Sequence, residues 1–246
     1  QMGSVSSTLK ALEAKGAVVI EHRRRMRGFS EDAARIAQRA VSGIDGDGVG
    51  GEAGGSASEP AADEGVAHAP SVKLQLTPGQ AHALDAIAAA CDAADGHVVL
   101  VDGVTGSGKT EVYLELIEKV VAEGRQVIVL IPEIALTYQT LLRFYTRFGD
   151  RVSVINSRLS QGERYDQFER AKRGEIDIMI GPRSALFTPF SRLGFIIIDE
   201  EHEGTYKSEN MPRYHAREVA IRRAQMCHAS VLLGSATPSV ESYDKA

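Results

Sequence analysis

The sequence has few cysteines and no long apolar run, and both shortages limit what the protein can be. Its 246 residues include two cysteines, Cys91 and Cys227, which lie far apart and lack the spacing of metal ligands. We therefore expect a reduced, cytoplasmic setting and no zinc site within this chain. No apolar run approaches the ~20 residues that cross a bilayer, and no signal peptide is visible, so we expect no membrane partner.

Positive charge is missing from residues 43–70, which carry six acidic side chains and no Lys or Arg. This segment is rich in Gly, Ala and Ser and cannot bury enough apolar surface to offset the entropy of ordering, so we expect a disordered linker. It supplies most of the net charge of −5, since residues 71–246 carry 20 basic and 23 acidic side chains. The overall acidity therefore does not exclude a polyanionic partner.

Residues 1–42 differ from this linker in charge, with eight Lys or Arg against four Asp or Glu. A helix over 7–15, a glycine and a strand over 17–21 resemble the C-terminal part of a winged-helix domain. The basic run 23–27 either contacts phosphates or is a solvated charge cluster. Because the first residue, Gln1, is not methionine, we expect the chain to be an excised fragment or to begin with vector-derived residues.

A glycine-rich stretch, Gly-Val-Thr-Gly-Ser-Gly-Lys-Thr over residues 103–110, matches G-x-x-x-x-G-K-[ST] at every fixed position. A strand-like run precedes it and a helix-compatible run follows, which is the setting in which such a loop binds phosphate at a helix N-terminus. Lys109 would reach the β- and γ-phosphates of ATP, and the Thr110 hydroxyl would help to hold Mg²⁺. A glycine-rich turn that binds nothing is the alternative. The loop residues expected to bind ATP are Gly103, Thr105, Gly106, Ser107, Gly108, Lys109 and Thr110.

Residues 71–246 alternate short apolar runs with helical patterns. Strands that are apolar throughout and separated by helices indicate a parallel sheet covered on both faces. With the phosphate loop, this pattern predicts a RecA-like α/β P-loop domain with a mainly parallel sheet flanked by helices. The expected strands are 97–101, 126–131, 151–155, 176–180, 195–198 and 231–234. The expected helices are 78–93, 110–122, 136–148, 161–172 and 217–226.

An apolar run that ends in Asp199 and Glu200 should bring two carboxylates to the edge of the sheet that carries the phosphate loop. Asp199 would hold Mg²⁺, and Glu200 would act on the water that attacks the γ-phosphate. A surface acidic cluster is the alternative. His202 is either structural or senses the γ-phosphate, and the hydroxyls of Ser235 and Thr237 should lie near the same edge.

These motifs together resemble the first motor lobe of a superfamily-two helicase. Over about residues 74–246 the likeness narrows to the PriA family of replication-restart helicases. It implies an ATP-dependent helicase that moves 3′ to 5′ on single-stranded or forked DNA. Its partners would be primosome and replisome proteins such as single-strand-binding protein, and its location the nucleoid. The strings that carry the resemblance are 103–114 (GVTGSGKTEVYL), 131–137 (IPEIALT), 181–190 (GPRSALFTPF), 213–220 (RYHAREVA) and 234–239 (GSATPS).

The resemblance also implies roles for single residues. Gln80 matches an adenine-reading glutamine, although an ordinary polar residue at a helix start is the alternative. Ser235 and Thr237 would couple hydrolysis to DNA movement. Arg183 would be a basic anchor for the strand, with a structural salt bridge as the alternative. The residues implied to contact DNA are Pro132, Glu133, Thr137, Arg183 and Ser184.

Residues 203–217 look like the family's aromatic-rich loop, which links DNA binding to the ATP site. Tyr206, Tyr214 and Arg217 are the residues expected to carry this link. The chain has no tryptophan, and Met211 and Pro212 stand where one is expected. Stacking contributes ~1–3 kcal/mol per base, so the strength of the coupling stays open.

The resemblance implies a second motor lobe that supplies an arginine finger, and we expect that lobe to lie outside the given sequence, which ends at Ala246. We therefore expect this chain to bind ATP and Mg²⁺ but to hydrolyse ATP poorly on its own. A DNA repair translocase of the same superfamily and a DNA-binding scaffold that uses ATP without hydrolysis are the alternatives. A small-molecule kinase is disfavoured by the Ser-Ala-Thr string.

Overall fold

We describe the fold from a computed structural model, which covers residues 75–93 and 97–243. The predictions of a winged-helix segment over 1–42 and a linker over 43–70 lie outside the described residues and stay predictions.

All six predicted strands and all five predicted helices are present, with ends that differ from the predictions by at most two residues. The helix predicted from residue 136 begins two residues later because Thr137 accepts a hydrogen bond from the Thr140 N–H and caps it. Short helices at 133–135, 149–151, 183–187, 204–206 and 240–243 were not predicted. The strands are β1 (Val98–Asp102), β2 (Gln126–Leu130), β3 (Val152–Val154), β4 (Ile178–Gly181), β5 (Leu193–Ile198) and β6 (Ser230–Ser235). The longer helices are α3 (Pro78–Ala93), α4 (Lys109–Ala122), α5 (Tyr138–Phe148), α6 (Gln161–Arg173) and α7 (Ala216–Cys227).

The strands form one sheet in the order β1-β6-β5-β2-β4-β3, and every neighbouring pair is parallel. The prediction of an α/β domain with a parallel, helix-flanked sheet is therefore confirmed. Because parallel strands all end at the same edge, the segments that follow β1, β2, β4, β5 and β6 meet there.

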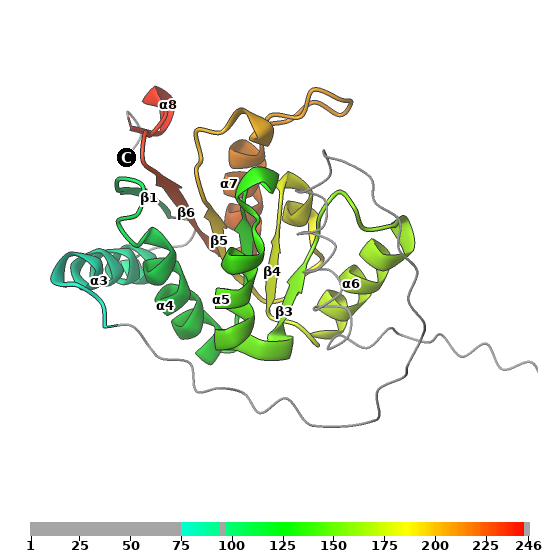
Figure 1. The fold of residues 1–246 in the computed structure, drawn as a ribbon, viewed down its shortest axis with the longest axis horizontal. Coiled ribbons are helices and arrows are strands. Elements are labelled where there is room, and N and C mark those ends of the chain that lie inside the picture. Colours follow the sequence, from blue (N-terminus) through cyan, green and yellow to red (C-terminus); the bar gives the residue numbers. More distant parts are fainter. Residues whose placement is uncertain (1–74, 94–96, 244–246) are drawn as a thin grey trace, which may run out of the picture.

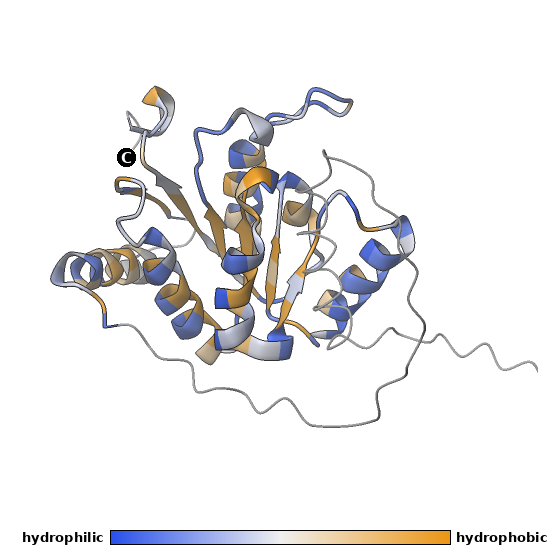
Figure 2. Cartoon of the chain, viewed as in Figure 1, coloured by the Kyte–Doolittle hydropathy of each residue, from blue (hydrophilic) through white to orange (hydrophobic). Residues whose placement is uncertain are grey.

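Two clusters of buried side chains form the core, one on each face of the sheet. Val127 and Val129 of β2 belong to the cluster under α3, α4 and α5, whereas Ile128 and Leu130 belong to the cluster under α7. Alternate residues of a strand point to opposite faces, so a strand buried on both faces must be apolar throughout. Figure 1 shows α4 and α5 on one side of the sheet and α7 behind it, and Figure 2 shows hydrophobic strands and hydrophilic outer helix faces.

Capping residues determine where α6 begins and ends. Ser160 and Glu163 form a capping box at the start of α6, each side chain bonding the other residue's backbone N–H. Gly174 ends α6 in the left-handed conformation at φ 73°. Among the described helices, none is long and apolar enough to cross a membrane.

Candidate active site

The predicted phosphate loop joins β1 to α4. Gly106 and Gly108 adopt φ values of 81° and 84°, which residues other than glycine rarely adopt. Gly108 caps α4 without any side-chain hydrogen bond to the first turn. The N–H groups at this helix start are therefore not all taken by side chains, and the helix dipole favours an anion there.

Lys109, the first residue of α4, is buried and folds back over the loop. Its Nζ donates to the Gly103 carbonyl oxygen at 2.6 Å and lies 3.8 Å from Oε1 of Glu200. Glu200 has φ 48°, so the turn after β5 adopts a left-handed conformation at a non-glycine residue. This conformation has a free-energy cost that packing must offset. It brings the Glu200 carboxylate toward Lys109.

Asp199 is held at two different atoms by two tyrosines. The Tyr113 hydroxyl donates to Oδ1 of Asp199 at 3.1 Å, and the Tyr206 hydroxyl donates to its backbone carbonyl at 2.6 Å. Burial raises the pKa of the Asp199 carboxyl, and the charge of Glu200 raises it further, while the Tyr113 hydrogen bond opposes the rise. Tyr113 was not predicted as a site residue, although it lies in the string 103–114 that contains the phosphate loop.

The predicted His202, Ser235 and Thr237 lie together. Nδ1 of His202 and Oγ of Ser235 are 2.7 Å apart, and the same hydroxyl accepts a hydrogen bond from the Thr237 N–H at 3.1 Å. Nδ1 of His202 also lies 3.7 Å from Oε2 of Glu200. The ends of β5 and β6 are thus connected by side chains next to the carboxylate pair.

Gln80 lies beside the phosphate loop, with both ends of its amide engaged. Oε1 accepts from the Thr77 N–H at 2.9 Å, and Nε2 donates to the Ser107 carbonyl at 2.9 Å. A Cβ at Gly108 would lie 2.2 Å from Nε2 of Gln80, so a larger residue there would displace the Gln80 amide from the loop. In this arrangement Gln80 positions the loop; adenine reading by Gln80 stays a prediction.

Glu201 was not predicted as a functional residue, yet it is the centre of a buried polar cluster. Its carboxylate accepts from the Ser239 N–H at 2.7 Å, from the Ser242 hydroxyl at 3.0 Å and from Nη1 of Arg217 at 3.2 Å. These hydrogen bonds and the charge of Arg217 hold the pKa of Glu201 below its ordinary value, although burial opposes them. The cluster joins the turn after β5 to α7 and to the segment after β6. Arg217 is therefore placed inside the domain.

The residue types near Lys109 fit a hydrated magnesium ion. Asp199, Glu200 and Thr110 offer carboxylate and hydroxyl oxygens, which are the ligands that Mg²⁺ prefers. Burial and the charge of Glu200 raise the pKa of Asp199 although Lys109 lowers it, and a divalent cation held by Asp199 would favour its charged form.

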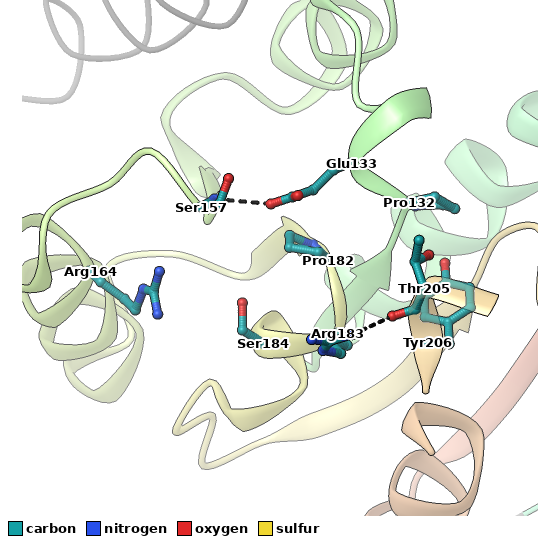
Figure 3. A pocket seen from close by; sticks show the side chains of 9 residues that line it. All are labelled: Pro132, Glu133, Ser157, Arg164, Pro182, Arg183, Ser184, Thr205 and Tyr206. Carbon is teal, nitrogen blue, oxygen red and sulfur yellow. Dashed lines mark hydrogen bonds between the residues drawn. The ribbon is translucent and has the colours of Figure 1, made fainter. Parts of the chain in front are cut away.

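A second site, a pocket of about 340 Å³, lies at the same edge of the sheet. It has the size of small ligand pockets. Figure 3 shows that its walls come from the segments after β2, β3, β4 and β5 and from α6. The predicted Pro132, Glu133, Arg183, Ser184 and Tyr206 line it, whereas Thr137 lines an adjacent pocket. The wall residues that were not predicted are Ser157, Arg164, Pro182 and Thr205.

The contacts of two predicted residues of this pocket are with protein backbone, and their predicted roles stay predictions. Tyr206 is 1% exposed, so its ring lies inside the domain. Its hydroxyl bonds the backbone carbonyls of Leu130 and Asp199. Arg183 donates to the carbonyls of Thr205 and Lys207 at 2.8 and 3.0 Å, so its partners are backbone atoms rather than the acid of a salt bridge.

Residues 207–215 form an arm that extends from the body of the domain, visible as the orange loop at the top of Figure 1. A bridge between Lys207 and His215 and a hydrogen bond from the Ser208 N–H to the Tyr214 carbonyl close its base. Tyr214 packs edge-on against Phe187 with ring centroids 5.5 Å apart. At the tip, the Met211 side chain is 85% exposed.

Comparison with protein families identifies a DEAD/DEAH box helicase domain over residues 77–246. Among curated proteins, the chain is 54% identical over 173 residues to "Replication restart protein PriA" of Bacillus subtilis, covering 70% of this chain and 22% of that protein. It is 40% identical over 239 residues to the protein of the same name from Synechocystis, covering 97% of this chain and 24% of that protein. The chain thus spans about a quarter of the length of these relatives.

Among solved structures, the chain is similar to RecG bound to a three-way DNA junction. The TM-score is 0.50 at 22% identity, over 70% of this chain and 22% of that one. At this level of identity the likeness concerns the fold, and it agrees with the RecA-like architecture described above.

Proposed function

The chain belongs to the DEAD/DEAH box helicases, and from this premise we propose that it is the ATP-binding motor lobe of a replication-restart DNA helicase. The proposed helicase moves 3′ to 5′ on single-stranded DNA and couples this movement to ATP hydrolysis at abandoned forks. Its similarity to proteins named "Replication restart protein PriA" supports this proposal. Primosome proteins, single-strand-binding protein and a nucleoid location belong to the same proposal.

Asp199 and its two tyrosine contacts carry the proposal. The Tyr113 hydroxyl reaches its carboxylate from α4, the helix that follows the phosphate loop, while the Tyr206 hydroxyl reaches its carbonyl from the wall of the second pocket. A helicase must connect nucleotide and DNA, and one half-buried residue here, Asp199, contacts elements of both candidate sites. A kinase or a simple nucleotide-binding module has no need of such a connection.

Each residue of the nucleotide site has a proposed task. Lys109 leaves the Gly103 carbonyl to bind phosphate oxygens, with Glu200 close enough to hold the ammonium in the absence of nucleotide. Asp199 and Thr110 hold Mg²⁺, which neutralises charge on the phosphates when it is bound. Glu200 accepts a proton from the attacking water. His202 relays the state of this carboxylate to Ser235 and Thr237, and Gln80 reads adenine.

The second pocket is the proposed path of the DNA strand. Its walls offer the hydroxyls of Ser157, Ser184 and Thr205, together with two arginines, and such groups track a phosphate backbone without reading sequence. Thr137 in the adjacent pocket and Tyr214 on the arm extend this path. Arg217, inside the domain, couples the arm to the Glu201 cluster.

Substitution of Glu200→Gln in the full-length protein tests the function. We expect ATP to bind, while DNA-stimulated turnover and displacement of a strand from a 3′-tailed fork fall about 10²–10⁴-fold, because the general base is lost. Glu123→Gln, an exposed carboxylate at the far end of α4, is the matched control. Strand displacement that survives Glu200→Gln contradicts the hydrolytic mechanism. Stimulated turnover by the unmodified protein without strand displacement indicates a translocase instead.

A further inference from the structure

The pocket beside the nucleotide site has two arginines in its wall, and the hydrogen bonds that they make within the protein differ. Arg183 precedes Ser184 in the segment after β4, and Arg164 projects from the first turn of α6 (Figure 3). The third charged group, Glu133, has Oε1 bonded to the Ser157 N–H at 3.1 Å. The pocket therefore has one more cationic side chain than anionic ones, and an anion is the ligand that its charge favours.

Arg183 is used to hold protein backbone. One nitrogen, Nη1, donates to the carbonyls of Thr205 and Lys207 on either side of Tyr206. These bonds fix the segment from which the Tyr206 hydroxyl reaches the Asp199 carbonyl. Withdrawing Arg183 toward a ligand would break both bonds and loosen the wall of the pocket.

Arg164 has spare hydrogen-bonding capacity. A guanidinium has five N–H donors. Within the part of the chain that the structure describes, the guanidinium of Arg164 makes one hydrogen bond, a long one of 3.4 Å from Nη2 to the Asn156 carbonyl. Its Nε is buried and has no partner among the same residues. Folded proteins keep few unpaired buried donors, so an unpaired donor beside a pocket indicates a functional role or a partner from solution.

We propose that Arg164 is the residue that pairs with a phosphate group of the DNA strand in this pocket, and that Arg183 is a positioning residue that holds the wall. The inference deepens the proposed function and rests on it. A guanidinium binds phosphate oxygens through two parallel N–H groups, and the unused donors of Arg164 supply them. The hydroxyls of Ser157 and Ser184 lie in the same wall and complete a polar cradle.

The salt dependence of DNA binding separates these two roles. A cation that neutralises a phosphate releases a counterion, and each such contact contributes about 0.7 to the slope of log K against log salt for single strands. The full-length protein and its R164Q and R183Q variants are titrated with fluorescent oligo-dT over a range of salt concentrations. We expect R164Q to reduce the slope by about 0.7 and to weaken binding about tenfold or more at low salt. We expect R183Q to leave the slope unchanged.

The lysine variants provide the second measurement. R164K keeps the charge, so its slope stays at the unmodified value even though the paired donors are lost. The lysine of R183K is one bond shorter than arginine and does not reach both carbonyls, so DNA stimulation of ATP turnover falls in R183K as it does in R183Q. If R164Q fails to fold, judged by thermal unfolding, R164K decides: a slope that falls in R164K contradicts the ionic contact.

Two other outcomes overturn the inference. An unchanged slope in folded R164Q removes Arg164 from the DNA path, and a slope reduced in R183Q instead assigns the phosphate to Arg183. Failure of the proposed function looks different, because the unmodified protein then neither binds oligo-dT nor shows DNA-stimulated ATP turnover. Equal effects on oligo-dT and oligo-dC are expected, since phosphate contacts do not depend on sequence.

Discussion

The nucleotide site and the DNA-facing pocket share one edge of the sheet, but their charged groups are used differently. At the nucleotide site, Lys109 and Glu200 lie 3.8 Å apart, and the backbone carbonyl that Lys109 bonds belongs to its own phosphate loop. In the pocket, Arg183 and Glu133 bond backbone groups of segments more than 20 residues away. A charged residue within a motif therefore either binds the ligand or holds the wall of the site in place. Its hydrogen-bond partners in the protein distinguish these two roles.

Lys109→Ala tests this comparison with the largest expected effect, which is on the affinity for ATP. Charge-assisted hydrogen bonds contribute about 1.5–3 kcal/mol, so ATP binding to this chain should weaken about 10–100-fold. Titration with a fluorescent ATP analogue measures the change. Lys119→Ala removes the same charge from the exposed last turn of α4 and serves as the control. Equal weakening in both variants would mean that net charge, not the position of Lys109, governs binding.

The second prediction compares a glycine at the nucleotide site, Gly234, with a glycine beside the pocket, Gly204. A Cβ at Gly234 would lie 1.7 Å from the Tyr113 hydroxyl, whereas a Cβ at Gly204, beside the pocket, meets nothing within 4 Å. Overpacking costs about 1–3 kcal/mol, so Gly234→Ala should lower the free energy of unfolding by that amount and displace Tyr113 from Asp199. Gly204→Ala should change it little. Urea unfolding of this chain measures both, and similar losses would contradict the close packing at Gly234.

The two tyrosines at Asp199 give a smaller and more specific contrast. Tyr113→Phe removes a hydrogen bond to the carboxylate, so the pKa of Asp199 should rise further above its ordinary value. Tyr206→Phe removes bonds to two backbone carbonyls and should not change that pKa. Each removed bond should cost about 0.5–1.5 kcal/mol of stability. Carboxyl titration by NMR distinguishes the variants, and an equal shift in both would reject the separate roles.

The smallest expected effect is on acid stability. The folded-state pKa of Glu201 lies below its ordinary value of 4.5, so the stability that it contributes is present above pH 4.5 and is lost as pH falls through the lowered pKa. Glu201→Gln should therefore lose less stability than the unmodified chain on acidification below pH 4.5. Glu218→Gln, an exposed carboxylate 3.6 Å from Nε of Arg217, is the control. A parallel decline in the Glu201→Gln variant and the unmodified chain would contradict this linkage.

Much of the fold could be predicted because its signals are local. Apolar runs such as those of β2 and β5 are buried on both faces, and residues two positions apart share a face whatever the rest of the chain does. The phosphate loop and the Asp199-Glu200 pair could be predicted as well, because the residues of each motif are adjacent in the sequence. The short helices escaped prediction because one turn of helix has too few residues to show a period.

The second pocket and the Glu201 cluster could not be predicted in the same way. Arg164 and Ser157 lie between the recognised strings, and nothing in their neighbours distinguishes them from surface residues. Glu201 does stand in the string Asp-Glu-Glu-His, and that position could have drawn attention to it. Its partners Ser239 and Ser242 lie about 40 residues away, and this separation hid the cluster.

The sequence by itself determined the parallel sheet, the phosphate loop and the order in which carboxylates and hydroxyls reach its edge. Only the tertiary structure decided which of these groups remain free. Tyr206 is buried, and its hydroxyl donates a hydrogen bond to the Leu130 carbonyl, 76 residues away. Arg183 donates hydrogen bonds to two carbonyls more than 20 residues away. Local pattern specifies which way a side chain leaves its strand or helix. Its availability depends on partners that distant segments bring to it, and these come together only when the chain folds.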